Sequence, residues 1–415
     1  MIYAATLNSA VIPPTLSCES AAIYDCDYEI VIYAKKGEQS MHPASTTKVA
    51  TLLYCLSLKP DRGLFFMVAP EVLRVLPKEK KIALNYAIDP YILEPDATLV
   101  GLVPHGIYSI NDLYHALELI SANDAANALA HYLGGGSIEA FMLRLNEFLV
   151  NIGCEATTLV NPNGLEYPSH RTTAIDMAKI YAHGLKDPEF MEIMGKVSFT
   201  FGSKEVLDPA LQTFNVLIRP EKDLFYKYCI GGKTGYTENA GFCFTGAAKN
   251  RERTLSIALM RSTSSKERFI DAINLFNAAF EEKKEVRTFY NKADPCFYLK
   301  PINRKISVAL QLEEELMIET FASRLAVLEP TIILDEVAVP IAKGQVCGRV
   351  DIVTPKGKVV LSKPLFAAEA AGHTIWTLLA QYRYETTLLF IALSIGFFIV
   401  KRILSRRKVQ NLSEE

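Results

Sequence analysis

The chain has 415 residues, of which 50% are hydrophobic and 22% charged, and its formal net charge is −2. This length is too great for one compact core and predicts two or three domains, while the near-neutral charge argues against a nucleic-acid partner. The eight cysteines are scattered, with no C-x-x-C pair and no histidine at ligand spacing, so we expect neither a metal site nor a cofactor.

The first motif follows a predicted β-hairpin over residues 21–34. A helix is predicted to begin near Ala44 and to run to about Leu58, with Ser45 and Lys48 one turn apart on the same face. Ser45 would lie in the first turn, where free N–H groups favour a developing anion. The lysine can take the serine proton if burial or nearby cations lower its pKa. The S-x-x-K pattern also occurs on ordinary surface helices, so it needs partners.

The second motif lies between two predicted helices. One helix covers residues 111–120, with apolar side chains at helical spacing, and the next begins at Asp124. Ser121 and Asn123 therefore fall in a tight loop, with alternate side chains able to point the same way. Taken alone, S-x-N in such a loop is usually capping chemistry.

The third motif, Lys233-Thr234-Gly235, precedes two strands predicted at residues 241–248 and 254–260. An amphipathic helix over residues 265–283 follows them. Strands near both ends of this region, with helices between them, predict an α+β fold in which helices cover an antiparallel sheet.

The sequence after the third motif and its helix contains two further regions of different composition. Residues 285–366 contain short strand-like runs separated by Pro, Gly and charged turns, which predicts a small all-β domain. Residues 386–400 carry no charge and a basic cluster follows from Lys401, which favours a C-terminal membrane helix with a cytoplasmic tail. Residues 1–16 do not have the pattern of a signal peptide.

Together the three motifs are typical of one group of enzymes. S-x-x-K, S-x-N and K-T-G occur in this order in penicillin-binding proteins and class A β-lactamases. The sequences Asn163-Gly164-Leu165 and Gly232 to Thr237, the β-rich second domain and the C-terminal anchor extend the likeness. The chain thus resembles the low-molecular-weight penicillin-binding proteins, the D-alanyl-D-alanine carboxypeptidases of the S11 peptidase type.

The resemblance implies a domain plan with a β-lactamase/transpeptidase-like fold at its centre. The expected parts are an N-terminal segment at 1–20, a penicillin-binding serine peptidase domain at 21–284, a β-rich domain at 285–368, a linker and C-terminal membrane anchor helix at 369–404, and a cytoplasmic tail at 405–415. The catalytic domain would lie on the outer (periplasmic) side of the bacterial cytoplasmic membrane.

The resemblance also implies catalytic roles. Ser45 would attack the peptide carbonyl between two terminal D-alanines, with Lys48 as base. Ser121 and Asn123 would relay the proton to the leaving amine and hold the substrate amide. Backbone N–H groups of Ser45 and Tyr236 would form the oxyanion hole.

The K-T-G strand would recognise the carboxylate end of the substrate. Lys233 would lower the pKa of Lys48 and attract the substrate carboxylate. Thr234, Thr237 and Arg268 are the candidates to bind that carboxylate, and Gly235 lies between the two threonines.

The expected substrates are peptidoglycan pentapeptide stems, with β-lactam antibiotics as inhibitors. A D,D-endopeptidase that cuts cross-links shares all three motifs and remains an alternative. A class A β-lactamase is disfavoured because no E-x-x-L-N sequence lies between the second and third motifs. A non-catalytic wall-binding protein is disfavoured because all three motifs keep their reactive residues.

Overall fold

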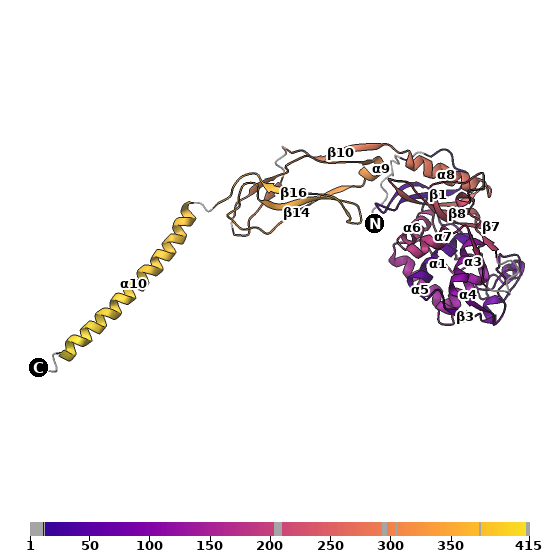
Figure 1. Cartoon of the computed structure of the whole chain (residues 1–415), viewed down its shortest axis with the longest axis horizontal. Coiled ribbons are helices and arrows are strands. Elements are labelled where there is room, and N and C mark those ends of the chain that lie inside the picture. Colours follow the sequence, from indigo (N-terminus) through magenta and orange to yellow (C-terminus); the bar gives the residue numbers. More distant parts are fainter. Residues whose placement is uncertain are drawn as a thin grey trace. The chain divides into compact units, whose positions relative to one another are not determined.

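The computed structural model describes residues 11, 13–202, 210–292, 297–303, 305–372 and 375–411. These residues form two compact units, Met1–Glu285 with Thr320–Val327, and Val286–Glu319 with Leu328–Glu415 (Figure 1). All predicted catalytic residues belong to the first unit. Most of the predicted N-terminal segment, residues 1–10 and 12, lies outside the described residues, as does the end of the predicted tail at 412–415.

A five-stranded antiparallel sheet organises the first unit, in the order β2-β1-β9-β8-β7. Its strands are β1 (Ser20–Asp25), β2 (Ile30–Lys35), β7 (Cys229–Thr237), β8 (Gly241–Lys249) and β9 (Thr254–Ser262). The predicted hairpin and the sheet built from distant parts of the chain are both confirmed. Strand β7, which carries the K-T-G motif, lies at one edge of the sheet, so the outer side of its backbone is free of strand pairing.

Both faces of this sheet are covered, which follows from the alternation of apolar side chains along the strands. On β1, Tyr24 belongs to one hydrophobic cluster and its neighbour Ile23 to the other. Helix α6 (Ala174–Gly184) packs on the first face and α8 (Glu267–Phe280) on the second, as Figure 1 shows. The predicted amphipathic helix at 265–283 is therefore α8.

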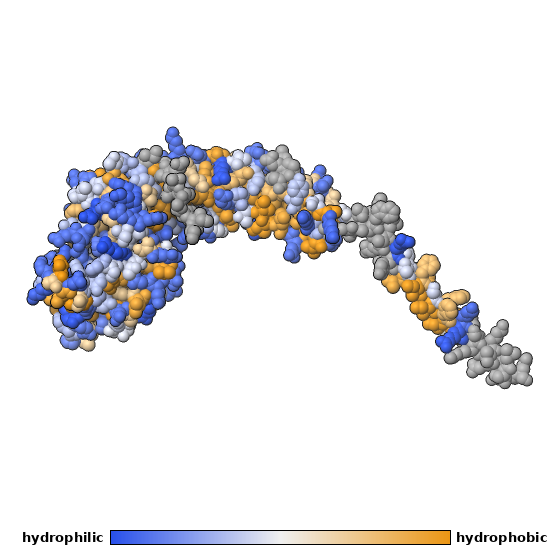
Figure 2. Space-filling model, turned by 180° about the vertical axis from the view of Figure 1, so that it is seen from behind, coloured by the Kyte–Doolittle hydropathy of each residue, from blue (hydrophilic) through white to orange (hydrophobic). Residues whose placement is uncertain are grey.

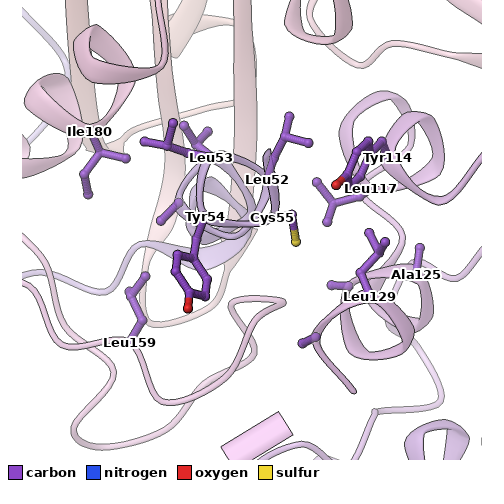
Figure 3. Close-up of a cluster of buried hydrophobic side chains, with 14 of the residues drawn as sticks. Leu52, Leu53, Tyr54, Cys55, Tyr114, Leu117, Ala125, Leu129, Leu159 and Ile180 are labelled. Carbon is purple, nitrogen blue, oxygen red and sulfur yellow. The ribbon is translucent and has the colours of Figure 1, made fainter. Parts of the chain in front are cut away.

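The first face also supports a helical lobe, at whose centre lies α1. The lobe comprises α1 (Thr47–Ser57), α3 (Ile110–Leu119), α4 (Asn123–Leu133), α5 (Ile138–Asn151), α6 and α7 (Pro188–Met194). Every residue of α1 from Thr47 to Leu56 is buried. Figure 3 shows Leu52 and Leu53 among side chains of α3, α4 and α6. Burial of one leucine side chain stabilises a fold by about 1.5–3 kcal/mol, so α1 is a rigid base for the residues at its N-terminus.

Smaller elements complete the first unit. They are η1 (Ala44–Thr46), β3 (Phe65–Met67), η2 (Pro70–Leu73), α2 (Lys78–Ala83), β4 (Ile107–Ser109), β5 (Ser198–Thr200), β6 (Ala210–Gln212), η3 (Val216–Ile218) and α9 (Ala322–Leu325). Helix α9 belongs to the segment 320–327, which returns to this unit after the chain has left it.

A buried charge network holds that returning segment. Asp25 accepts hydrogen bonds from Arg324 at 2.8 and 3.0 Å and from Arg253 at 2.9 and 3.1 Å. Arg253 also pairs with Glu282 at 2.6 Å. The side chains of Asp25 and Arg253 are fully buried, so each charge depends on the others.

The second unit is mainly β-structure up to Ala367, as predicted, but residues 320–327 of the predicted β-rich domain at 285–368 belong to the first unit. One sheet has the order β11-β12-β16-β15-β14, and β10 pairs with β13. The strands are β10 (Lys284–Tyr290), β11 (Phe297–Leu299), β12 (Val308–Gln311), β13 (Leu316–Phe321), β14 (Glu329–Leu334), β15 (Val346–Val353) and β16 (Val359–Ala367).

The chain continues into one long helix, α10 (Ile375–Asn411). Its large apolar side chains between Leu388 and Val400 are exposed in the single chain (Figure 2). The predicted membrane-spanning helix is nevertheless not supported, because among the described residues no helix is both long and apolar enough to cross a bilayer. The uncharged run at 386–400 is shorter than the roughly 20 residues that a spanning helix needs.

Candidate active site

Ser45 and Lys48 are in contact, as their spacing predicts. The Lys48 Nζ atom donates a hydrogen bond to Ser45 Oγ at 2.9 Å. The expected helix start needs correction, because Ser45 lies in the 3₁₀ turn η1 and the α-helix begins only at Thr47. Ala44 has a left-handed backbone with φ of +50°, which interrupts a regular helical start before the serine.

Lys48 is fully buried and has two further acceptors. Its Nζ atom donates to Asn123 Oδ1 at 2.6 Å and to the Asn163 carbonyl oxygen at 2.5 Å. Burial lowers the pKa of Lys48 well below its usual value, and the positive charge of Lys233 lowers it further. A lysine with a lowered pKa can be neutral near neutral pH and accept the proton of the serine hydroxyl.

The second motif brings a strained serine to the same place. Ser121 has φ of +65°, in the left-handed region that non-glycine residues rarely adopt, and is 6% exposed. Its Oγ atom is buried and has no hydrogen-bond partner among the described residues. Ser121 lies between α3 and α4, as predicted, but Asn123, which was predicted to lie in that loop, is the first residue of α4. Asn123 accepts a hydrogen bond from Lys48, so both motif residues lie at the junction of the two helices.

The third motif approaches Ser45 along the edge strand β7. Lys233 and Thr234 are buried, whereas the Tyr236 side chain is 54% exposed. A Cβ atom on Gly235 would lie 2.9 Å from the Ser45 backbone nitrogen and 3.0 Å from that of Thr46. A glycine is therefore required at 235, because any side chain would separate the strand from the nucleophile.

Arg268 belongs to the site, although the sequence left open whether it is merely solvated. It is 8% exposed, and its Nη1 atom donates to the Gly235 carbonyl oxygen at 3.2 Å. Its Nη2 atom donates to Ser265 Oγ at 3.1 Å. Burial lowers the pKa of Arg268 to about 10, which leaves the guanidinium charged at neutral pH.

Two residues of the 161–165 turn were missed as part of the site. Asn163 supplies the carbonyl acceptor for Lys48, and its side chain donates to Asn127 Oδ1 at 3.0 Å. Gly164 has φ of +88°, and a Cβ atom there would lie 2.0 Å from the Ala44 carbonyl oxygen. The Asn-Pro-Asn-Gly sequence signals a turn but does not show which helix the turn touches.

A third missed residue is Glu118, three positions before Ser121 on α3. Its side chain is buried, and burial raises its pKa to about 8 against the opposing effect of Lys233 and Lys48. The sequence placed this glutamate on a helix with apolar spacing, where an acidic residue is ordinarily solvated. Only the structure shows that it lies inside, close enough to the two lysines to act on them.

The three motifs surround a cavity of about 740 Å³. Its lining includes Ser45, Ser121, Asn123, Thr234, Thr237 and Arg268. The nucleophile Ser45 and the cationic Arg268 thus line one concave surface, and the buried Lys48 contacts Ser45 at 2.9 Å. This arrangement suits attack on a carbonyl compound that carries a negative charge. Glu166, which also lines the cavity, is held by Asn239 at 2.8 and 2.9 Å and by Lys78 at 3.1 Å.

Comparison with known proteins agrees with this arrangement. Residues 71–264 match a family described as D-alanyl-D-alanine carboxypeptidase, Peptidase S11. The match contains the second and third motifs, and Ser45 and Lys48 lie before it.

Among relatives, the chain is 36% identical to D-alanyl-D-alanine carboxypeptidase DacB2 of Mycobacterium tuberculosis over 171 residues, which cover 40% of this chain and 55% of that protein. It is 24% identical to D-alanyl-D-alanine carboxypeptidase DacF of Bacillus subtilis over 85% of each chain.

The fold is also similar to solved structures. Penicillin binding protein 5 of Haemophilus influenzae superposes with a TM-score of 0.61 at 24% identity, over 88% of this chain and all of that chain. A D-alanyl-D-alanine carboxypeptidase of Mycobacterium tuberculosis gives a TM-score of 0.56 at 27% identity, over 66% of this chain and 96% of that one. These likenesses establish the penicillin-binding protein/transpeptidase fold.

Proposed function

Because residues 71–264 match the family described as D-alanyl-D-alanine carboxypeptidase, Peptidase S11, we propose that the chain removes the terminal D-alanine of peptidoglycan stem peptides through an acyl-enzyme on Ser45. The observation that carries this proposal is the contact of 2.9 Å between the Lys48 amine and the Ser45 hydroxyl. The pKa of that amine is lowered by burial, as a general base requires.

In the acylation step, Ser45 Oγ attacks the carbonyl carbon between the two D-alanines while its proton passes to Lys48. The C–N bond then breaks, and D-alanine leaves with a proton delivered through the unpartnered hydroxyl of Ser121. Backbone N–H groups of Ser45 and Tyr236 stabilise the oxyanion. The close approach of β7 to the Ser45 nitrogen supports this pairing of donors.

The carboxylate of the terminal D-alanine binds at the other end of the cavity. Thr234 and Thr237 line that end with hydroxyl donors, and Arg268 supplies a buried positive charge. Lys233 adds a second cation behind them. A free carboxylate is the feature that distinguishes a carboxypeptidase substrate, and this cluster of donors supports that preference.

Water then hydrolyses the ester on Ser45 and releases the shortened stem peptide. A penicillin carries a carboxylate and a strained amide carbonyl, so it acylates Ser45 by the same steps. Its leaving group stays attached to the acyl-enzyme, which slows the attack of water. The reaction would take place outside the cytoplasmic membrane, where peptidoglycan lies.

A fluorescent penicillin tests the proposal. The full chain and its Ser45→Ala variant are incubated with the reagent, and the adduct is located by mass spectrometry. A stable adduct on Ser45 that is lost in the variant is expected. A folded wild-type protein that takes up no label would contradict the serine mechanism.

Two further substrates separate the reactions that share this mechanism. Release of D-alanine from a peptide ending in D-Ala-D-Ala is the result expected for a carboxypeptidase. Cleavage of cross-linked dimers without release from pentapeptides would indicate an endopeptidase instead. Rapid turnover of the antibiotic would indicate a β-lactamase.

A further inference from the structure

The carboxyl group of Glu118 is buried within electrostatic range of Lys48 and Lys233. The residue is 2% exposed, and its Oε2 atom has no hydrogen-bond partner among the described residues. A buried and unsatisfied carboxyl group destabilises a protein unless a nearby charge compensates it. The charges that act on this group are those of Lys233 and Lys48.

Lys233 is a buried positive charge with a weak hydrogen-bond acceptor. Its side chain is 1% exposed, and within the described part of the chain its Nζ atom donates only to the Thr234 carbonyl oxygen, at a long distance of 3.4 Å. Lys48, by contrast, has three acceptors within 2.9 Å. Nearby Arg268 opposes the charge of Lys233, and Glu118 is the carboxyl group that supports it.

We propose that Glu118 is a positioning residue that keeps Lys233 positively charged while Lys48 is neutral, through the charge of its buried carboxylate. The inference rests on the proposed function, because it concerns the carboxylate-binding cation of that site. It explains how two buried lysines in one cavity can serve opposite purposes, one as a base and one as a cation.

The protonation equilibria agree with this arrangement. Burial raises the pKa of Glu118 to about 8 and lowers that of Lys233 to about 8, so the two groups titrate over the same range. As the pH rises, Glu118 releases its proton to solvent, and the new carboxylate holds the proton on Lys233. An uncharged residue at 118 cannot do this.

Other titratable groups lie on the surrounding elements, and the other carboxyl groups among them act on residues other than Lys233. Asp124 of α4 acts on Lys48, and Glu189 and Glu192 of α7 act on Tyr114 and His115 of α3. Arg268 of α8 opposes the charge of Lys233, and Glu118 influences Tyr181 of α6. The Asp124 carboxylate already accepts from four backbone N–H groups, those of residues 100, 101, 102 and 125. Glu118 is therefore the carboxyl group that remains available to Lys233.

The test is the pH profile of acylation by a fluorescent penicillin, measured on the full chain between pH 6 and 9. In Glu118→Gln, Lys233 loses its proton at lower pH than in the wild type. We expect acylation about tenfold slower than wild type at pH 9 and within about twofold of it at pH 6. A role in packing alone would lower the rate equally at every pH.

Lys233→Arg provides the matched background, because arginine stays charged throughout this range. Adding Glu118→Gln to Lys233→Arg is expected to change acylation at pH 9 by less than about twofold. If Glu118→Gln still slows acylation at pH 9 when residue 233 is arginine, the effect of Glu118 does not depend on the protonation of Lys233, and the proposal is overturned.

Glu118→Asp keeps the negative charge and is the second test if Glu118→Gln does not fold. The alkaline limb of its acylation pH profile is expected to lie within about half a pH unit of that of the wild type. Its thermal midpoint is measured in parallel to show that the variant is folded. An alkaline limb in Glu118→Asp that is displaced further, or an unchanged profile in folded Glu118→Gln, overturns the inference. Failure of the wild-type protein to take up penicillin would instead count against the proposed function.

Discussion

Gly164→Ala tests how tightly the 161–165 turn controls the nucleophile. The added Cβ atom would lie 2.0 Å from the Ala44 carbonyl oxygen and 3.0 Å from the Ser45 nitrogen, whereas ordinary contacts begin at 3.4 Å. Either the turn or the residues around Ser45 must therefore move by roughly 1 Å. A shift of about that size at a reacting group can slow a reaction on the order of 100-fold.

The same substitution also strains the backbone, and a second glycine separates the two effects. Gly164 has φ of +88° and Gly153 has φ of +81°, but a Cβ atom on Gly153 meets nothing within 4 Å. An alanine in this left-handed region costs about 1–2 kcal/mol at either position. Only Gly164→Ala adds the steric overlap with the turn that carries Ser45.

The assay is the second-order rate of penicillin acylation, with the free energy of unfolding measured in urea. Gly153→Ala is expected to lose about 1–2 kcal/mol of stability and to acylate within about twofold of wild type. Gly164→Ala is expected to lose more stability and to acylate about 100-fold more slowly. Wild-type acylation by Gly164→Ala, or an equal slowing in Gly153→Ala, would refute the reasoning.

Three other outcomes are expected. Asp25→Ala leaves Arg253 and Arg324 without their shared carboxylate, so the free energy of unfolding in urea falls by about 3–5 kcal/mol; a loss below about 1 kcal/mol would contradict the role of the network. Ser121→Gly removes the strain of a left-handed backbone, so the free energy of unfolding is expected to rise by about 1 kcal/mol. It also removes the proposed proton relay, so release of D-alanine is expected to fall roughly 10²–10⁴-fold, and full activity would exclude the relay. Lys48 acts only when neutral, so acylation is lost as pH falls through its lowered pKa. Lys233→Met removes a charge that lowers this pKa and should move the acid limb of the profile to higher pH; an unmoved limb would show that Lys233 does not act on Lys48.

Those parts of the site that depend on local spacing could be predicted from the sequence. Contact between Ser45 and Lys48 follows from an i, i+3 separation on one helical turn. The loop position of Ser121 follows from two apolar periodicities with a polar break between them. Strands β1, β2, β8 and β9 could be predicted as well, because short runs rich in apolar and β-branched residues are bounded by turn residues.

Features that depend on contacts between distant segments could not be predicted. Glu118 has the sequence context of an amphipathic helix, and nothing local shows that its carboxyl group is buried and influenced by the charges of two lysines from other elements. Arg324 lies 299 residues from Asp25, yet the two form a buried pair. Local patterns carry no information on such pairings, which depend on how the chain returns to the first unit.

Strain at two buried residues indicates that the geometry of the site is fixed before any substrate binds. Ala44 and Ser121 adopt left-handed backbones, which cost about 1–2 kcal/mol each for residues with a Cβ atom. Such conformations persist only where the surrounding packing determines them, and both residues are at most 6% exposed. They flank the contact between Ser45 and Lys48, whose helix α1 is buried over its first ten residues, from Thr47 to Leu56. A rigid nucleophile and base need no rearrangement during acylation, so a stem peptide and a penicillin of similar shape can react at the same serine.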